Sequence, residues 1–195
     1  AFGACLAGKR SFCGMKHVGV NVAADPLFTA SYTGVNAGLI IGVADDPGMH
    51  SSQNEQDSRH YAKASKIMML EPSDSSECKE FTKLAYKLSE EYDTPVFLRL
   101  STRVSHSQSL VEIGERADVA LKDYEKNIGK YVMMPAMAKK RHVIVEDRCE
   151  AISEYGYDCP FNKIEINDTK IGIITCGISY QYAKEAIPNA SFLKL

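Results

Sequence analysis

A run of apolar residues at 39–44 passes abruptly into a long polar stretch, and this boundary limits the possible folds more than any other part of the chain. The run reads Leu-Ile-Ile-Gly-Val-Ala, which is typical of a strand buried on both faces, as in a parallel sheet covered by helices. The polar stretch ends at Arg59. In open parallel sheets, ligands bind outside the carboxyl ends of the strands, so this loop is either a binding site or a solvated connection.

Other segments before residue 110 repeat the same strand-and-helix order. The spacing of Asp74 and Glu77 is that of a capping box, and an apolar stripe from Cys78 to Leu88 predicts a helix that packs on a sheet. The sequence therefore predicts an α/β fold, with a mostly parallel sheet and helices on both faces. Beside residues 39–44, strands are predicted at 11–15, 66–71 and 96–100, and helices at 1–8, 18–32, 57–65 and 75–88.

The pattern weakens after residue 107 and becomes regular again near the C-terminus. An acidic helix is predicted at 143–155, and the basic run Lys139-Lys140-Arg141 is typical of a solvated face. A strand, a helix and a strand are predicted at 170–175, 179–186 and 191–195. We therefore divide the chain into a first domain (1–110), a connecting region (111–169) and the start of a second domain (170–195).

Composition and charge exclude several classes of partner. The chain has 195 residues and a net charge of -2, and its lysines and arginines are scattered, so no nucleic acid partner is predicted. No apolar run approaches the ~20 residues of a membrane-spanning helix. Six cysteines without a C-x-x-C pair indicate a reduced, cytoplasmic protein and no metal site. Neither end carries a targeting signal, and we expect a fragment of a longer protein.

Polar side chains follow four of the predicted strands, at residues 16–21, 45–57, 72–76 and 101–106. In a parallel sheet these segments converge on one edge. His17 is either a catalytic or substrate-binding group or a hydrogen-bonded structural residue, and Arg103 either holds a carboxylate or forms an interface ion pair. The candidate site residues at this edge are His17, Asn21, Asp45, Asp46, His50, Ser51, Ser52 and Arg103.

No motif in the chain names a reaction. The sequence contains no G-x-S-x-G, no G-x-x-x-x-G-K-[ST], no H-E-x-x-H and no G-x-G-x-x-G after a strand. The residues alone therefore predict a polar site for a small organic ligand or for another subunit.

Residues 14–74 resemble a known family, most distinctively in the stretch DDPGMHSSQNEQDSR. They are similar to the α subunits of indolepyruvate:ferredoxin oxidoreductases, which belong to the thiamine-diphosphate-dependent 2-oxoacid:ferredoxin oxidoreductases. The C-terminal stretch KIGIITCGISYQYAKEAIPNASFLKL resembles the start of the transketolase-C-like domain of those subunits.

The resemblance implies that residues 1–110 form a pyrimidine-binding domain, which faces the aminopyrimidine of thiamine diphosphate. It implies an enzyme that oxidatively decarboxylates aryl 2-oxoacids such as indolepyruvate to acyl-coenzyme A, with ferredoxin as electron acceptor. The implied cofactors are thiamine diphosphate with magnesium and iron-sulfur clusters, and the implied partner chain is a β subunit.

Carried over residue by residue, the resemblance places Lys16, Gly19 and Asn21 beside the cofactor, together with His50 and Ser51, and makes His17 the candidate catalytic residue. The family's catalytic Glu is expected upstream of Ala1 and is absent from this sequence. The sequence also lacks a G-D-G motif followed by a magnesium-binding Asn, and it lacks the clustered cysteines that bind iron-sulfur clusters. We therefore expect the fragment to bind no cofactor tightly and to be inactive by itself. The alternative is a non-catalytic α/β domain that docks a partner subunit.

Overall fold

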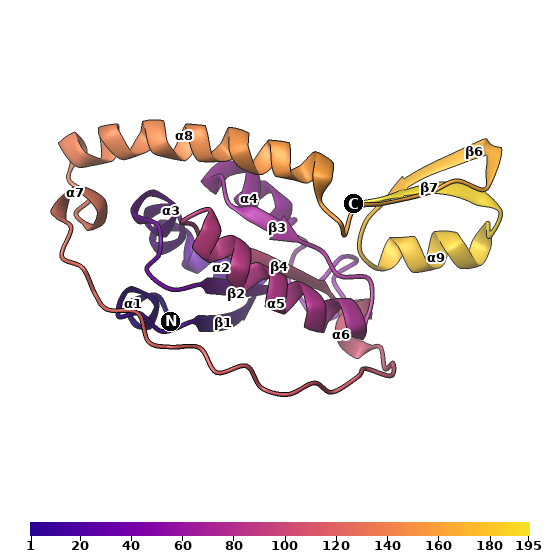
Figure 1. Ribbon diagram of the computed structural model, residues 1–195. Coiled ribbons are helices and arrows are strands. Elements are labelled where there is room, and N and C mark those ends of the chain that lie inside the picture. The colour runs from indigo at the N-terminus through magenta and orange to yellow at the C-terminus, as the bar shows by residue number, and fades with distance from the viewer.

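The computed structural model describes all residues from 1 to 195, and its larger part is built on a four-stranded parallel sheet (Figure 1). The strand order is β1-β2-β4-β3, and every neighbouring pair is parallel. The carboxyl ends of all four strands therefore lie at one edge. The strands are β1 (Ser11–Lys16), β2 (Leu39–Asp45), β3 (Met68–Leu70) and β4 (Val96–Ser101).

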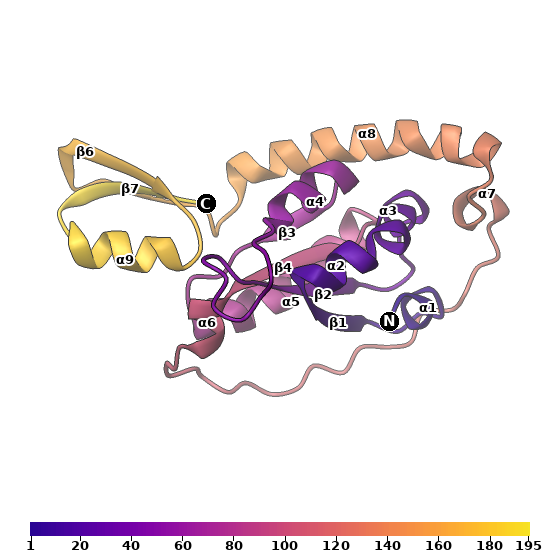
Figure 2. The ribbon, with the colours of Figure 1, turned by 180° about the vertical axis from the view of Figure 1, so that it is seen from behind.

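Helices cover both faces of this sheet, which confirms the predicted α/β class. On one face, apolar residues of α2 (His17–Val22), α3 (Ala24–Thr33) and α4 (Ser58–Ser65) pack against Val43 and Phe97 (Figure 2). On the other face, α5 (Ser75–Glu91) packs against β2 and β4 through its apolar stripe. Strand β2 is sandwiched between these layers, which explains its nearly continuous apolar sequence.

The start of α5 has the predicted Asp74 cap, but Glu77 reaches Ser73, the residue before the cap, and not the N–H of Asp74 as in a capping box. The Asp74 side chain accepts a hydrogen bond from the backbone N–H of Glu77, and the Glu77 carboxylate accepts one from the N–H of Ser73. The bond to Asp74 satisfies the N–H of Glu77, which has no partner inside the helix, and the bond from Ser73 fixes the chain that leads into it. The local sequence thus fixes where α5 begins.

Two predicted helices differ from the structure in extent. The single helix predicted at 18–32 is two helices, α2 and α3, which are separated at Ala23. The helix predicted at 143–155 is longer, because α8 spans Pro135–Asp158. Proline is favoured in the first turn of a helix, and Pro135 occupies that place.

The solvated face predicted for Lys139-Lys140-Arg141 is wrong for Arg141. Arg141 and Arg148 are each 7% exposed and lie with Val145 on one side of α8. Their guanidinium groups donate to backbone oxygens of Tyr32 and Ser31 at 2.7 and 2.8 Å. These cations therefore dock α8 onto α3, where carbonyl acceptors compensate their burial.

Residues 107–127 form an irregular segment that runs along the outside of the molecule between α6 (Thr102–His106) and α7 (Ile128–Tyr131) (Figure 1). Several hydrogen bonds join the segment to the body, among them one from the N–H of Lys122 to Gly8 O just after α1 (Phe2–Leu6) and one from Asn36 to Asp123 O. Leu110 and Ile113 are 100% and 98% exposed.

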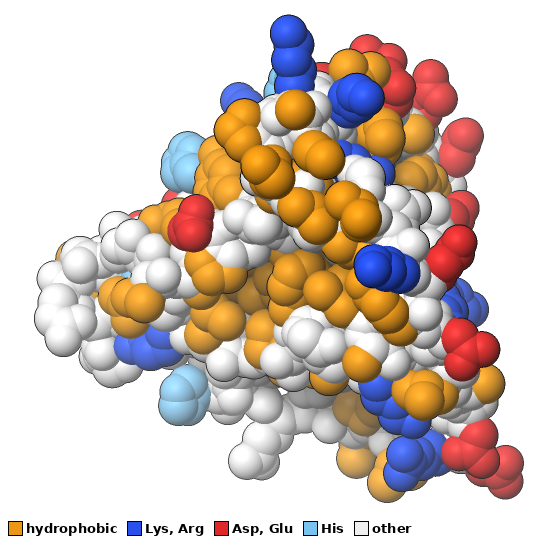
Figure 3. All heavy atoms as spheres, turned by 90° about the vertical axis from the view of Figure 1, so that its left-hand side faces the viewer, with side chains coloured by type: hydrophobic (Ala, Val, Ile, Leu, Met, Phe, Trp, Pro, Cys, Tyr) orange, Lys and Arg blue, Asp and Glu red, His pale blue; other side chains and the backbone are white.

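Hydrophobic side chains also gather on the end of the molecule that carries α1, α3 and α7 (Figure 3).

A second, three-stranded sheet follows α8. Its order is β5-β7-β6, with β6 (Asp168–Thr175) and β7 (Ala190–Lys194) parallel and joined by α9 (Ile178–Ala186), as predicted. The antiparallel strand β5 (Lys163–Glu165) was not predicted, because three residues carry too little periodicity. No helix of the chain is long and apolar enough to cross a membrane.

Buried polar contacts join the second sheet to the first part of the chain. Lys194 of β7 is 1% exposed, and its ammonium group donates to Glu77 and, at 3.2 Å, to Ser73 Oγ. Gln181 Nε2 of α9 lies 3.2 Å from Asp74 Oδ2. The capped start of α5 is therefore also the contact point for the second sheet.

Candidate functional site

The carboxyl edge of the first sheet brings the predicted segments together. The parallel register pairs Lys16 with Ala44 and Asp45 with Ser101, so the residues that follow β1, β2 and β4 begin side by side. The polar stretch after β2 forms a loop, residues 46–57, that ends at the start of α4. This loop is the main feature of the edge.

Asp46 closes the base of this loop. Its carboxylate accepts from the N–H groups of His50 (3.1 Å) and Ser51 (2.8 Å) and from the hydroxyls of Ser52 and Thr102, both at 2.7 Å. These bonds, the Ser51 N–H first among them, hold the pKa of Asp46 well below its ordinary value. An ionised acceptor thus ties the loop to the end of β4.

Lys16 and His17 contact the other side of the loop. Lys16 Nζ donates to Ser51 O at 3.1 Å and to Ser52 Oγ at 2.7 Å. The His17 ring is 0% exposed, its Nε2 lies 3.2 Å from Asn54 O, and its Nδ1 is buried without a partner. The structure therefore joins Lys16 with Ser51 and places His17 beneath the loop.

The remaining predicted residues occupy different positions around this contact. Asn21 and His50 are exposed, on α2 and on the loop. Gly19 lies where an added Cβ would be 2.9 Å from Met15 Cβ, so it permits the close packing of α2 on β1. Arg103 is exposed on α6 and forms no ion pair.

An ion-pair network that the sequence did not reveal lies behind the loop. Arg99 Nε donates to Asp45 Oδ2 at 2.6 Å, and its Nη1 donates to Glu71 Oε2 at 2.8 Å. Asp45 also accepts from the N–H and the hydroxyl of Ser58. Burial lowers the pKa of the Arg99 guanidinium, but the charges of Glu71 and Asp45 outweigh this and raise it. The one available signal was a single arginine inside the apolar strand Val96–Ser101.

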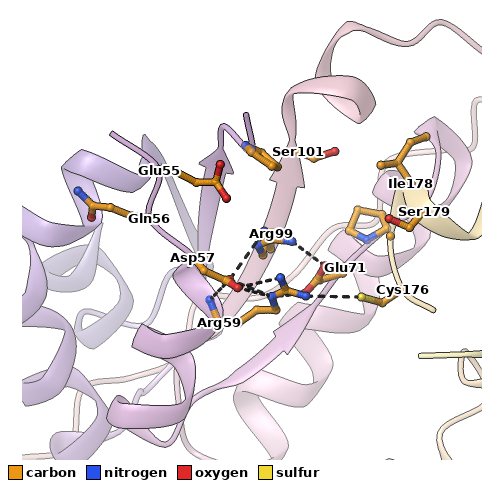
Figure 4. Close-up of a pocket in the computed structure, with 13 residues that line it drawn as sticks. Glu55, Gln56, Asp57, Arg59, Glu71, Arg99, Ser101, Cys176, Ile178 and Ser179 are labelled. Carbon is orange, nitrogen blue, oxygen red and sulfur yellow. Dashed lines mark hydrogen bonds and ion pairs between the residues drawn. The ribbon is translucent and has the colours of Figure 1, made fainter. Parts of the chain in front are cut away.

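A polar pocket of about 190 Å³ lies between this network and the start of α9 (Figure 4). Arg59 Nη2 pairs with Asp57 Oδ2 at 2.7 Å, which lowers the pKa of Asp57 to about 2. Arg59 Nη1 lies 3.9 Å from Cys176 Sγ, and burial raises the pKa of that thiol. The thiol is therefore protonated at neutral pH and is no activated nucleophile.

This pocket is suited to binding rather than to bond breaking. Its two arginines, Arg59 and Arg99, are already paired with Asp57 and Glu71, and its hydroxyls come from Ser101 and Ser179. Gly177 turns the chain from β6 into α9 with a φ of 54°. No group of three or more His, Cys, Asp or Glu side chains is arranged to hold a metal ion.

Comparisons with known proteins agree on one family. The family model described as pyruvate flavodoxin/ferredoxin oxidoreductase, thiamine diphosphate-binding, matches residues 1–156. The indolepyruvate oxidoreductase subunit IorA of Archaeoglobus fulgidus is 46% identical, and the match covers 97% of this chain and 31% of that protein. IorA of Pyrococcus abyssi is 44% identical, with 100% and 32% covered. The chain thus spans about a third of the length of these relatives.

A solved structure shares the fold. It is a 2-oxoglutarate:ferredoxin oxidoreductase from Magnetococcus marinus with 2-oxoglutarate, coenzyme A and succinyl-CoA bound. The TM-score is 0.65 at 14% sequence identity, and the match covers 100% of this chain and 43% of that chain.

Proposed function

The chain belongs to the thiamine-diphosphate-binding family of pyruvate flavodoxin/ferredoxin oxidoreductases, and from this we propose that it is part of a subunit that oxidatively decarboxylates aryl 2-oxoacids such as indolepyruvate. The family match over residues 1–156 carries the proposal. The names of the similar proteins, indolepyruvate oxidoreductase subunits, support the substrate class.

In this proposal the carboxyl edge of the first sheet is the pyrimidine side of a thiamine diphosphate site. Bound thiamine diphosphate would supply the nucleophilic carbon that attacks the keto carbon of the substrate. The edge suits such a ring because its loop presents exposed polar groups while Asp46 and Lys16 fix its base and side. Lys16, Gly19, Asn21, His50 and Ser51 are the residues that we assign to this wall.

We assign His17 a positioning role within this site. Its ring is wholly buried and contacts the loop at Asn54 O, so it acts on the cofactor through the loop rather than by direct contact. The unpartnered Nδ1 favours the tautomer in which Nε2 carries the proton and donates to that oxygen. The ring would thereby hold the loop against the end of β1.

Other parts of the enzyme complete the proposed site. We infer that magnesium, the diphosphate-binding motif, the iron-sulfur clusters and the catalytic carboxylate are held outside residues 1–195, in part by a β subunit. Ferredoxin and coenzyme A are the proposed electron acceptor and acyl acceptor. The Magnetococcus marinus protein is a ferredoxin oxidoreductase whose structure holds coenzyme A, which supports this choice.

The division into residues 1–110, 111–169 and 170–195, the last as the start of a transketolase-C-like domain, is part of the same proposal. Six free cysteines accord with a cytoplasmic location.

A non-catalytic assembly role is the second candidate. Hydrophobic side chains gather on the end of the molecule that carries α1, α3 and α7, and a contiguous apolar patch of this kind is typical of a subunit contact (Figure 3). In this second function the polar edge docks a partner chain.

Substitutions in the assembled full-length enzyme separate the two functions. Lys16→Met and His50→Ala should raise the KM for thiamine diphosphate or lower turnover while subunit assembly stays normal, and the exposed control Lys139→Met on α8 should change neither. Loss of assembly with normal turnover in the remaining complex would favour the second function. Thiamine diphosphate with magnesium should raise the melting temperature of the full-length enzyme but not that of this chain alone.

A further inference from the structure

A cavity of about 560 Å³ lies on the outer side of α5. Its walls come from the residues before β1, from the middle of α5 and from residues 115–119 of the irregular segment (Figure 1). Sites for small molecules commonly measure about 300–1,000 Å³. Arg10 and Lys16 flank opposite ends of β1, about 20 Å apart at the rise of a strand, so this cavity is separate from the carboxyl edge.

Five cations and two carboxylates line this cavity, although the whole chain has a net charge of -2. The cations come from three separate parts of the chain, and two carboxylates, Glu115 and Asp118, line the cavity with them. The lining cations are Lys9, Arg10, Lys83, Lys87 and Arg116.

Two of these cations are already held in place. Arg10 donates to Glu90 through Nε and Nη2 at 2.9 and 3.0 Å, and its guanidinium lies 5.5 Å from the centre of the Tyr86 ring. Lys83 pairs with Glu80 at 3.0 Å. Lys9, Lys87 and Arg116 form no ion pair within the chain, so one unpaired cation stands on each of the three walls.

We propose that this cavity binds a small anion that carries a diphosphate group. A diphosphate has oxygen acceptors on two linked phosphorus centres and can contact cations on several walls at once, which a single carboxylate cannot. Charge-assisted hydrogen bonds from Lys and Arg are the usual means of binding phosphate. The concave shape under residues 115–119 favours a small molecule over a protein surface.

Isothermal titration of the 195-residue chain with inorganic pyrophosphate and with ADP, at low salt, tests this site. Lys9→Gln combined with Lys87→Gln should weaken pyrophosphate binding by about tenfold or more, since the loss of even one charge-assisted hydrogen bond weakens binding by about that factor. Arg116→Gln should weaken it as well. The control, Lys139→Gln with Lys140→Gln on the exposed face of α8, removes the same charge elsewhere.

A loss confined to the cavity variants supports the proposal. Tighter binding of ADP than of pyrophosphate then assigns a nucleotide to the cavity, whereas equal affinities assign the diphosphate group alone. The proposal is overturned if pyrophosphate does not bind, or if the control variant loses as much affinity as the cavity variants. Either failure leaves the function of the carboxyl edge untouched, because none of these residues belongs to it.

Discussion

Replacing Arg99 by methionine should destabilise the protein more than any other single change to the ion pairs at the carboxyl edge. The Arg99 side chain is 10% exposed, and that of its partner Asp45 is 1% exposed. Methionine fills similar space but donates no hydrogen bond. Asp45 would keep its bonds from Ser58 but lose Arg99, its only cationic partner within 3 Å. Glu71 would lose the bond at 2.8 Å that its carboxylate accepts from Arg99.

The size of the effect follows from the burial of this pair. Removing one partner of a buried ion pair typically costs about 3–5 kcal/mol, because a charge stays buried without compensation. Arg59 is a matched control in the same cluster, since it pairs with Asp57 but is 51% exposed. Exposed pairs contribute about 0–1 kcal/mol, so Arg59→Met should cost several-fold less than Arg99→Met.

Urea unfolding, followed by far-ultraviolet circular dichroism, measures both changes. With a slope of about 2 kcal/mol per M, Arg99→Met should lower the midpoint by about 1.5–2.5 M. Adding Asp45→Asn should recover part of the loss, because the amide removes the uncompensated charge. The reasoning fails if Arg99→Met and Arg59→Met lower the urea midpoint equally. It also fails if the double variant loses as much unfolding free energy as Arg99→Met and Asp45→Asn lose separately when added together.

Three further changes test other contacts. Asp46→Ala should release the loop that this carboxylate closes, and limited proteolysis should cleave the loop faster than in the wild type. Lys194→Met should speed hydrogen exchange in α9 and β7, whereas Lys184→Met, at a 42% exposed side chain, should not. The Arg10 bonds lower the pKa of Glu90 from 4.5 to about 2. Their contribution to stability is therefore full above pH 4.5 and disappears as the pH falls toward 2, so the difference in unfolding free energy between wild type and Arg10→Met should shrink over that range.

Much of the first sheet was predictable, because its signals are local. A strand buried on both faces has to be apolar throughout, and β2 between Leu39 and Val43 meets that demand. The Asp74 cap and the bond between Ser73 and Glu77 mark the start of α5 by contacts within four residues. The convergence of Lys16 with the 46–57 loop also followed, since the ends of parallel strands share one edge.

Buried charge was not predictable in the same way. Arg141 belongs to a basic run of a kind that is most often solvated, and its burial is explained by its bond to Tyr32 O, 109 residues away, and by its ion pair with Asp93. Arg99 likewise depends on Asp45 and on Glu71, which are distant in the chain. A charged side chain is stable in the interior only where partners meet it, and no local periodicity encodes such partners.

The α/β class, the position of most strands and helices, and the polar edge are thus properties of the amino-acid order, because hydrophobic periodicity and capping act over a few residues. Other features exist only in the folded chain: which charges are buried, how Lys194 joins the second sheet to α5, and where the cavity beside α5 lies. Each of these features requires side chains that are distant in the chain to come together, and the packing of the sheets and helices sets the distances between them.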